Sequence, residues 1–179
     1  PNWLKFEMEQ NKYIDVHDSS KTNRSTTDKI KSAKIYGGDF YVDGTYQVTD
    51  EGYEITSMVR NSKNGNIVNE RTFMGNDLFP LIDSLSLHLL KAIGLSSAQI
   101  EESIDLDFAE YTTYNLESLK QSVLSFKNGM ISLEKAVELD STFAGVNLFL
   151  AGLNHIGSRK LEAKANIDQA MRHRKKLPF

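Results

Sequence analysis

Four histidines and 24 acidic residues supply most of the side chains in this 179-residue sequence that could bind a metal ion or transfer a proton. His17 has acidic neighbours on both sides, in the segment DVHD. In a strand, Asp15 and His17 would lie on the same face, where a carboxylate and an imidazole could meet a metal ion. No two histidines have the HxxxH or HExxH spacing that places both on one helix face. We therefore interpret His17 as a strand-end residue beside solvated carboxylates, and we predict no metal site.

The other candidate motifs are incomplete. The acidic stretch 101–107, EESIDLD, lacks the glycine that a calcium-binding loop requires, so we interpret it as a solvated linker. The pair Gly37-Gly38 belongs to no phosphate-binding glycine motif and is better explained as the end of a helix. The absence of cysteine excludes disulfides, thiolate metal sites and cysteine nucleophiles. We predict no catalytic residues, no cofactor and no enzymatic activity.

Composition places the chain among ordinary globular proteins, with 40% hydrophobic and 25% charged residues. The formal net charge of −3 argues against binding to nucleic acid or to an anionic membrane surface. No apolar run approaches the roughly 20 residues that span a bilayer, so we predict no direct membrane insertion. The first ten residues lack the basic start and apolar block of a signal peptide. We interpret the chain as a piece of a longer protein, with its compartment open between envelope and cytoplasm.

The first half of the sequence predicts a small sheet with helices. Alternating apolar residues and the turn signal Asn64-Gly65 indicate an antiparallel three-stranded meander. Asp77 can cap a following helix, Pro80 lies in its tolerated first turn, and Gly94 can end it. A polar connector, 96–115, then leads to a purely helical half. The expected helices are 3–10 (weakly favoured), 27–38 and the one after Asp77, and the expected strands are 12–18, 39–48, 53–59 and 66–74.

The second half predicts helices at a repeating interval: 116–127, 131–140, 143–156 and 159–174. Ala136 and Ala170 lie 34 residues apart, as do Leu133 and Ile167, and 34 is the period of a tetratricopeptide repeat. Small residues let antiparallel helices approach closely. The residues we assign to repeat packing are Ala136, Leu150, Ala151, Ala163 and Ala170, with Phe149, Leu153, Ile167 and Met171 filling the space between helices. A generic helical hairpin with coincidental spacing is the alternative.

Stacked repeats of this kind form a concave surface that binds peptides or helices of partner proteins. Polar residues on the first helix of each hairpin are the candidates for such a groove. Asn147 and Asn154 are the main candidates, and Asn115 and Lys120 are secondary ones. Burial of Asn147 and Asn154 in the core would contradict this assignment.

The order of segments also resembles a known family. Gly44, Tyr53, Ile55 and the turn Asn64-Gly65, followed by the helix residues Phe79, Leu81 and Asp83, are similar to the last part of a TolB amino-terminal-like α/β domain. The segments YTTYNLESLKQS and AVELDSTFAGVNLFLA resemble the helical continuation that often follows this domain. Members normally begin with a further strand and helix, so the resemblance implies an open sheet edge here. It supplies no catalytic residues.

We therefore predict an α+β fold. An antiparallel three- to four-stranded sheet packed with helices occupies 1–105, and an all-α domain of tetratricopeptide-like hairpins occupies 110–179. The predicted function is a non-enzymatic scaffold or regulatory module of a larger bacterial protein that binds a protein or peptide partner. Homo-oligomers through the open sheet edge or through repeat stacking remain open. The alternative is a sensory module that binds a small ligand at the seam between the two domains, with aromatic surface from Tyr41, Tyr46, Tyr53 and Tyr111.

Overall fold

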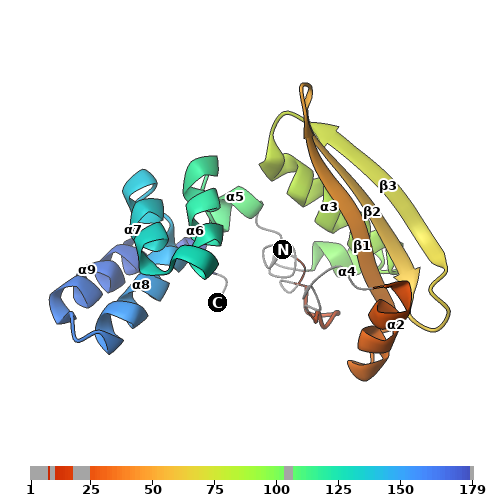
Figure 1. Ribbon diagram of the computed structural model, residues 1–179, viewed down its shortest axis with the longest axis horizontal. Coiled ribbons are helices and arrows are strands. Elements are labelled where there is room, and N and C mark those ends of the chain that lie inside the picture. The colour runs from red at the N-terminus through yellow and green to blue at the C-terminus, as the bar shows by residue number, and fades with distance from the viewer. Residues whose placement is uncertain (1–7, 9–10, 18–24, 103–106, 178–179) are drawn as a thin grey trace. The chain divides into compact units, whose positions relative to one another are not determined.

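The structure is a computed structural model that describes residues 8, 11–17, 25–102 and 107–177. The chain divides into two compact units, Pro1–Asp105 and Leu106–Phe179, where the sequence predicted domains 1–105 and 110–179. The first unit contains a three-stranded antiparallel sheet with helices, and the second contains helical hairpins (Figure 1). The predicted α+β fold followed by helical hairpins is therefore confirmed.

The sheet is a meander of strands β1 (Phe40–Thr49), β2 (Gly52–Asn61) and β3 (Ile67–Gly75) in the order β1-β2-β3. Gly65 adopts a φ of +77° in the second turn, and the side chain of Asn64 accepts a hydrogen bond from the Asn66 N–H at 3.0 Å. The left-handed conformation explains why glycine stands at this position. Both neighbouring pairs are antiparallel, as the Asn-Gly signal predicted.

Helix α3 (Leu78–Ala92) covers one face of the sheet (Figure 1). The Asp77 side chain accepts a hydrogen bond from the Phe79 N–H at 3.1 Å, and Gly94 adopts a φ of +97° just beyond the helix. Both predicted ends of the helix are therefore confirmed. The core between sheet and helix consists chiefly of Ile55, Val59, Phe73, Leu81, Leu85 and Leu89, all of which are buried.

Strand β1 keeps the predicted alternation, but its apolar face is largely uncovered. Val42, Tyr46 and Val48 point to the same side of the sheet as Ile55 and Val59, and their exposed fractions are 42%, 56% and 67%. The reason is that α3 packs against β2 and β3 and not across β1.

Gly44 provides the close backbone approach expected within β1. A Cβ placed on it would lie 2.2 Å from the carbonyl oxygen of Thr56 on β2, a separation that no side chain tolerates. Glycine is therefore required where these two strands come together most closely.

Helix α2 (Thr26–Ile35) packs at one end of β1, where the Lys29 ammonium lies 2.8 Å from the Asp43 carboxylate. Residues 12–17 form no strand, so that prediction is wrong. Of the expected helix 3–10 only Met8 is described, and it is helical, while the remainder lies outside the described residues. The connector contains two short helices, α4 (Ser97–Glu101) and α5 (Phe108–Tyr111), instead of a single turn.

The helical unit contains two antiparallel hairpins. The first pairs α6 (Leu116–Asn128) with α7 (Met130–Leu139), and the second pairs α8 (Ala144–Ile156) with α9 (Lys160–Arg172), followed by the 3-10 turn η1 (Arg174–Lys176). Contact between the hairpins runs through α7 and α8. The bounds differ from the predicted ones by at most two residues. No helix in the described part of the chain is long and apolar enough to cross a bilayer.

Candidate partner-binding surface

The seams between these helices contain the small residues that the sequence singled out. Ala136, Leu150, Ala151, Ala163 and Ala170 are each no more than 4% exposed. Ala136 lies in the α6–α7 hairpin, where its carbonyl oxygen accepts a hydrogen bond from the buried Ser118 hydroxyl at 2.8 Å. Side chains this small allow the helix backbones to approach closely enough for such a contact.

The larger residues expected to fill the seams behave differently. Phe149, Ile167 and Met171 are 59%, 45% and 53% exposed, so their assignment to the repeat core is wrong. Leu133, the supposed equivalent of Ile167 at an interval of 34, is buried. The second helices of the two hairpins begin at residues 130 and 160, which is a shorter interval than 34. Residues 34 apart therefore do not occupy equivalent positions throughout.

Asn147 and Asn154 do not line a groove, and this assignment is also wrong. They are 2% and 4% exposed and form hydrogen bonds inside the hairpin. The Asn147 amide donates to the carbonyl oxygens of Ser141 at 3.0 Å and Phe143 at 3.1 Å, and the Asn154 amide donates to Asn166 at 2.9 Å. The sequence interpretation treated both polar residues as surface residues. Instead, Asn147 hydrogen-bonds to backbone carbonyls at the α7–α8 joint, and Asn154 hydrogen-bonds to a side chain of α9.

The two secondary candidates lie nearer the surface. Asn115 is half-buried and caps α6, because its side chain accepts from the Ser118 N–H at 3.0 Å and donates to the Leu139 carbonyl at 3.2 Å. These bonds hold the start of α6 to the end of α7. Lys120 is exposed, with its ammonium 3.9 Å from Glu117. Of the four predicted groove residues, only Lys120 is fully available to a partner.

Asp140 organises the joint between the two hairpins. Its carboxylate accepts hydrogen bonds from the hydroxyl of the buried Thr113 at 2.5 Å and from the N–H and hydroxyl of Thr142 at 2.9 and 2.7 Å. Burial by itself would raise the pKa of Asp140, but these bonds outweigh burial and hold the pKa below its ordinary value. Asp140 thus joins the segment before α6 to the turn between α7 and α8.

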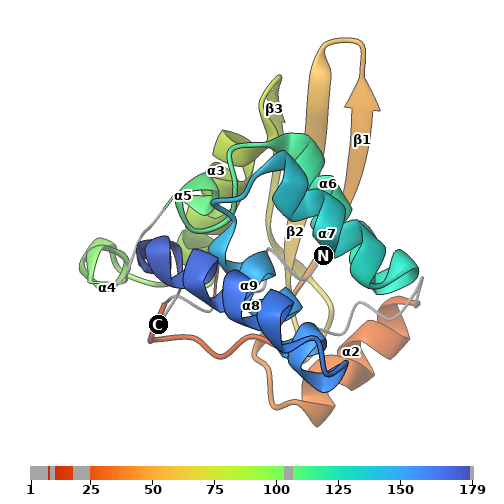
Figure 2. The ribbon, with the colours of Figure 1, turned by 90° about the vertical axis from the view of Figure 1, so that its left-hand side faces the viewer.

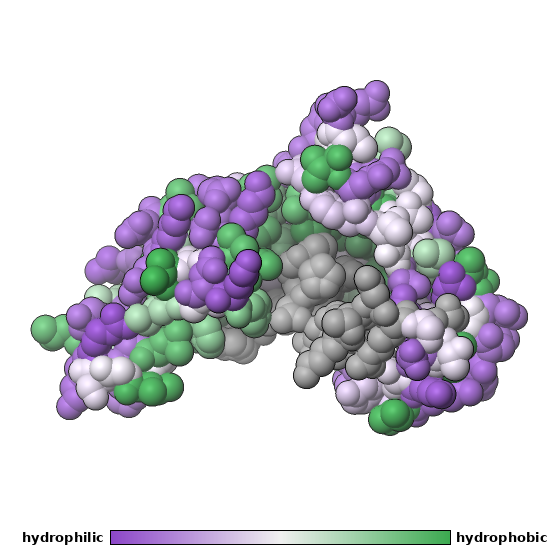
Figure 3. All heavy atoms as spheres, in the orientation of Figure 1, coloured by the Kyte–Doolittle hydropathy of each residue, from purple (hydrophilic) through white to green (hydrophobic). Residues whose placement is uncertain are grey.

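The outward side of α8 carries a row of exposed apolar side chains. We call Gly145, Leu148, Phe149, Gly152 and Ile156 the α8 outer face. Their spacing places them along one side of the helix, and the three large members are 40%, 59% and 81% exposed. A Cβ on either glycine would meet no atom within 4 Å. Figure 3 shows hydrophobic residues standing among hydrophilic ones on the surface of α6 to α9.

The two glycines of this face lower the stability of α8, and packing within the hairpin does not explain why they are there. Glycine inside a helix is destabilising by about 1 kcal/mol relative to alanine. Among the described residues, nothing near Gly145 or Gly152 excludes a side chain. Small residues between large apolar ones form the grooves and ridges against which a second helix packs. The α8 outer face therefore has the surface that a docking helix needs.

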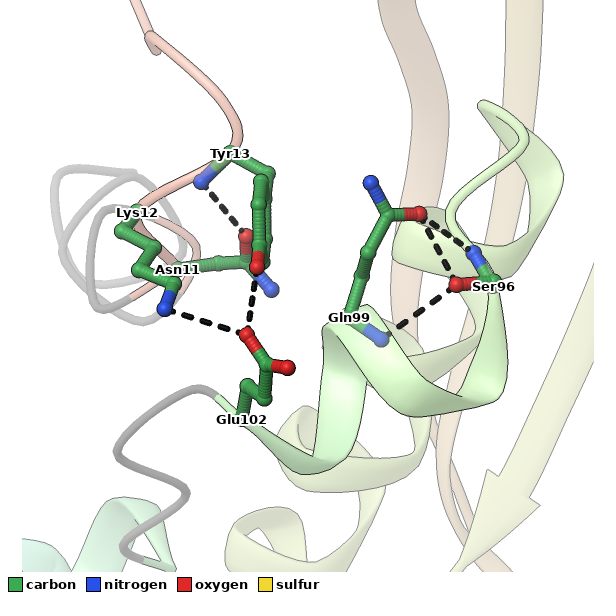
Figure 4. Close-up of polar contacts among 6 residues, drawn as sticks. All are labelled: Asn11, Lys12, Tyr13, Ser96, Gln99 and Glu102. Atoms are coloured by element: carbon green, nitrogen blue, oxygen red, sulfur yellow. Dashed lines mark hydrogen bonds and ion pairs between the residues drawn. The ribbon is translucent and has the colours of Figure 1, made fainter.

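A polar cluster that the sequence did not predict lies in the first unit (Figure 4). Glu102, just beyond α4, accepts a hydrogen bond from the Tyr13 hydroxyl at 2.5 Å and lies 3.1 Å from the Lys12 ammonium. The hydrogen bond from Tyr13, followed by that from Lys12, lowers the pKa of Glu102 below its ordinary value. Asn11, which is 2% exposed, accepts from the Tyr13 N–H at 2.9 Å.

This cluster connects Tyr13 to a partner 89 positions away in the sequence. Beside it in Figure 4, Ser96 and Gln99 form a capping box that begins α4. The serine-to-glutamine spacing is a recognisable sequence signal for this cap. No local sequence signal exists for the contact with Glu102.

The histidines do not assemble a site among the described residues. His17 lies 3.5 Å from Asp15 and stacks on the Tyr36 ring with centroids 4.9 Å apart. His88 packs edge-on against Phe73 and contacts the Asn69 side chain at 2.7 Å. It is half-buried, so it lies on α3 between the core and the surface. In the parts of the chain that the structure describes, no three histidine or acidic side chains are grouped to hold a metal ion.

Comparisons with protein-family models, with curated proteins and with solved structures found no match to this chain. The resemblance to a TolB amino-terminal-like domain and to tetratricopeptide repeats therefore stays a prediction drawn from the sequence.

Proposed function

We propose that this chain is a non-enzymatic interaction module of a larger bacterial protein, and that its helical unit binds a helix of a partner protein on the α8 outer face. The observation that carries the proposal is the exposure of Leu148, Phe149 and Ile156 along one side of α8. Water-exposed apolar side chains in one row mark interaction sites more often than singly scattered ones do.

The chemistry of this face favours an amphipathic helix as the partner element. Such a helix buries residues at positions i, i+3 or i+4 and i+7 into a complementary apolar surface. Phe149 offers a large aromatic anchor, and the open space over Gly152 lets the partner backbone approach. Removal of the Phe149 ring should cost about 2 kcal/mol or more of binding free energy if it is such an anchor.

The experiment uses the full chain as bait in lysate of its bacterial source, with mass spectrometry of the bound proteins. We expect Phe149→Ser to lose a partner that the unsubstituted chain retains. Leu161→Ser is the matched control, because Leu161 is 83% exposed on α9, outside the α8 outer face. The captured partner's helix is then synthesised and titrated by calorimetry. Equal recovery by both variants would show that the α8 outer face does not bind the partner.

The alternative function, a small-ligand sensor at the seam between the two domains, stays a prediction. Of the aromatic residues proposed for that seam, Tyr111 is buried in the helical unit. Tyr46 is 56% exposed and stacks on Tyr53 with ring centroids 6.3 Å apart, so both belong to the surface of the sheet.

A further inference from the structure

Strand β1 is an edge of the sheet with few of the features that keep edge strands from pairing. Its register with β2 is continuous over all ten residues, Phe40–Thr49. Figure 2 shows β1 running beside β2. Within the described residues, no element pairs with the side of β1 that faces away from β2. The other edge, β3, has an irregular register opposite Val59 and Arg60 and carries the charged pair Glu70 and Arg71.

Edge strands of natural proteins are usually protected by lysine, proline, bulges or inward-pointing charges. In β1 the only charged residue is Asp43, and it is held by the Lys29 ammonium at 2.8 Å. The following six residues, 44–49, carry no charge and no proline. Val42, Tyr46 and Val48 remain exposed along this strand. A strand that is long, regular, exposed on an apolar face and carries only one charged residue is a template for pairing with another strand.

We propose that β1 pairs in antiparallel fashion with β1 of a second copy of this chain, which joins two sheets into one of six strands. The strand is complementary to itself when Gly44 lies opposite Gly44 of the copy. Val42 then faces Tyr46, and on the other side of the sheet Asp43 faces Thr45. Aromatic residues opposite β-branched ones stabilise a strand pair, and in this register no like charges lie directly opposite each other, the two Asp43 side chains being diagonal neighbours.

The alternation of apolar and polar side chains about Gly44 is the reason to prefer a second copy over an unrelated strand. The central pairs of the self-paired strand place apolar opposite apolar residues on the α3 side and polar opposite polar ones on the other. In the single chain the Gly44 N–H donates to the Asp43 carboxylate at 2.9 Å. Strand pairing requires this N–H to leave the carboxylate and to donate to a backbone carbonyl of the copy instead. The two paired strands each span about 34 Å, and an edge contact of this kind buries less than the roughly 1,600 Å² of a standard interface. The dimer is therefore weak and forms only at high protein concentration.

The test is sedimentation of the full chain from about 5 µM to about 500 µM, where mass action reveals a weak dimer. We expect a monomer–dimer equilibrium that Tyr46→Lys weakens at least about tenfold, since it places a charge opposite an apolar residue in both symmetric pairs. The double variant Val42→Lys/Tyr46→Glu restores dimerisation, because each introduced cation then faces an introduced anion of the copy. Met74→Lys, at a residue 60% exposed on β3, is the matched control and leaves the dimer unchanged.

A chain that stays monomeric at the highest concentration overturns the proposal, as does a dimer that is insensitive to Tyr46→Lys. Failure of the double variant to restore the dimer refutes the Gly44-centred pairing. If Tyr46→Lys does not fold by circular dichroism, Val48→Lys replaces it, because that side chain is 67% exposed. Loss of the dimer in Phe149→Ser would instead place the contact on α8. Partner capture by Tyr46→Lys should be intact, so this proposal and the proposed function fail separately.

Discussion

The two buried asparagines of α8, Asn147 and Asn154, differ in how completely their side chains are hydrogen-bonded. We therefore expect the same substitution to change the free energy of unfolding differently at the two positions. The Asn147 amide donates two hydrogen bonds, at 3.0 and 3.1 Å, and its oxygen lies 3.4 Å from the Asn166 amide. Asn154 donates one hydrogen bond, to Asn166 at 2.9 Å, while its own side-chain oxygen is buried and has no partner among the described residues. Replacement by leucine keeps the number and branching of side-chain heavy atoms in both cases and removes the polar groups.

The magnitudes follow from counting these groups. Asn147→Leu removes two hydrogen bonds worth about 1 kcal/mol each, so we expect a loss of about 2 kcal/mol in the free energy of unfolding. Asn154→Leu removes one such bond, but it also removes a buried unpaired oxygen whose burial costs about 1 to 3 kcal/mol. Asn166 is half-buried, so water can replace its lost donor. We therefore expect Asn154→Leu to be neutral or stabilising, by up to about 2 kcal/mol.

The assay is urea unfolding of the full chain at 25 °C, followed by far-ultraviolet circular dichroism. The two compact units can unfold in separate transitions, so the fit allows for two, and hydrogen exchange of α8 and α9 amides identifies the helical one. Lys120→Ala, at an exposed residue, is the control and should change stability by less than about 0.5 kcal/mol. A larger loss for Asn154→Leu than for Asn147→Leu would refute the argument that hydrogen-bond satisfaction separates the two sites.

Three further substitutions test other parts of the fold. Ala170→Leu, at a residue 1% exposed in the α8–α9 seam, should destabilise the helical unit by about 1 to 3 kcal/mol in urea unfolding, because the helices must move apart. Gly44→Ala should destabilise the sheet unit by a similar amount, about 1 to 3 kcal/mol, because its Cβ would lie 2.2 Å from the Thr56 carbonyl oxygen. Asp140→Asn should reduce the acid sensitivity of the helical unit. The pKa of Asp140 is lower in the folded protein than its ordinary value, so its stabilising contribution is present above the unfolded pKa and is lost as the pH falls through the folded one. Melting temperatures measured from pH 7 to pH 3 should therefore fall less steeply in Asp140→Asn, which is already less stable at pH 7.

Controls for these three changes are available in the same chain. Gly145→Ala has open space around the new Cβ and should stabilise α8 by up to about 1 kcal/mol, in contrast to Gly44→Ala. A Gly44→Ala variant as stable as the unsubstituted chain would show that β1 and β2 can separate at little cost. An unaltered pH profile in Asp140→Asn would mean that Thr113 and Thr142 do not favour the charged carboxylate.

Local signals in the sequence were sufficient for most of the secondary structure. The turn Asn64-Gly65, the cap at Asp77 and the end at Gly94 depend on backbone conformation within a few residues, and the structure contains all three. The four long helices of the second unit follow from apolar periodicity, which is also a local property. Residues 12–17 were misassigned as a strand from their apolar pattern. In the structure they form no strand, and Tyr13 donates a hydrogen bond to Glu102, 89 positions away, for which the sequence gives no local signal.

The candidate site was harder to predict than the fold. A helix pattern shows that Asn147 and Phe149 point to different sides, but it does not state which side is buried. The sequence favoured burial for the aromatic ring and exposure for the amide, and the structure has the reverse. The amide can be buried because the backbone carbonyls of Ser141 and Phe143 accept hydrogen bonds from it at the joint.

The sequence by itself determined the three strands of the meander and the long helices to within a few residues, and it indicated which small residues, such as Ala136 and Ala170, enter the seams. Backbone conformation and side-chain size act over a few residues, so they can be read along the chain. Only the tertiary structure decided that Val42, Tyr46 and Val48 of β1 are exposed and that α8 turns Phe149 outward. Exposure depends on which elements pack together, and that choice is made by contacts between residues far apart in the sequence.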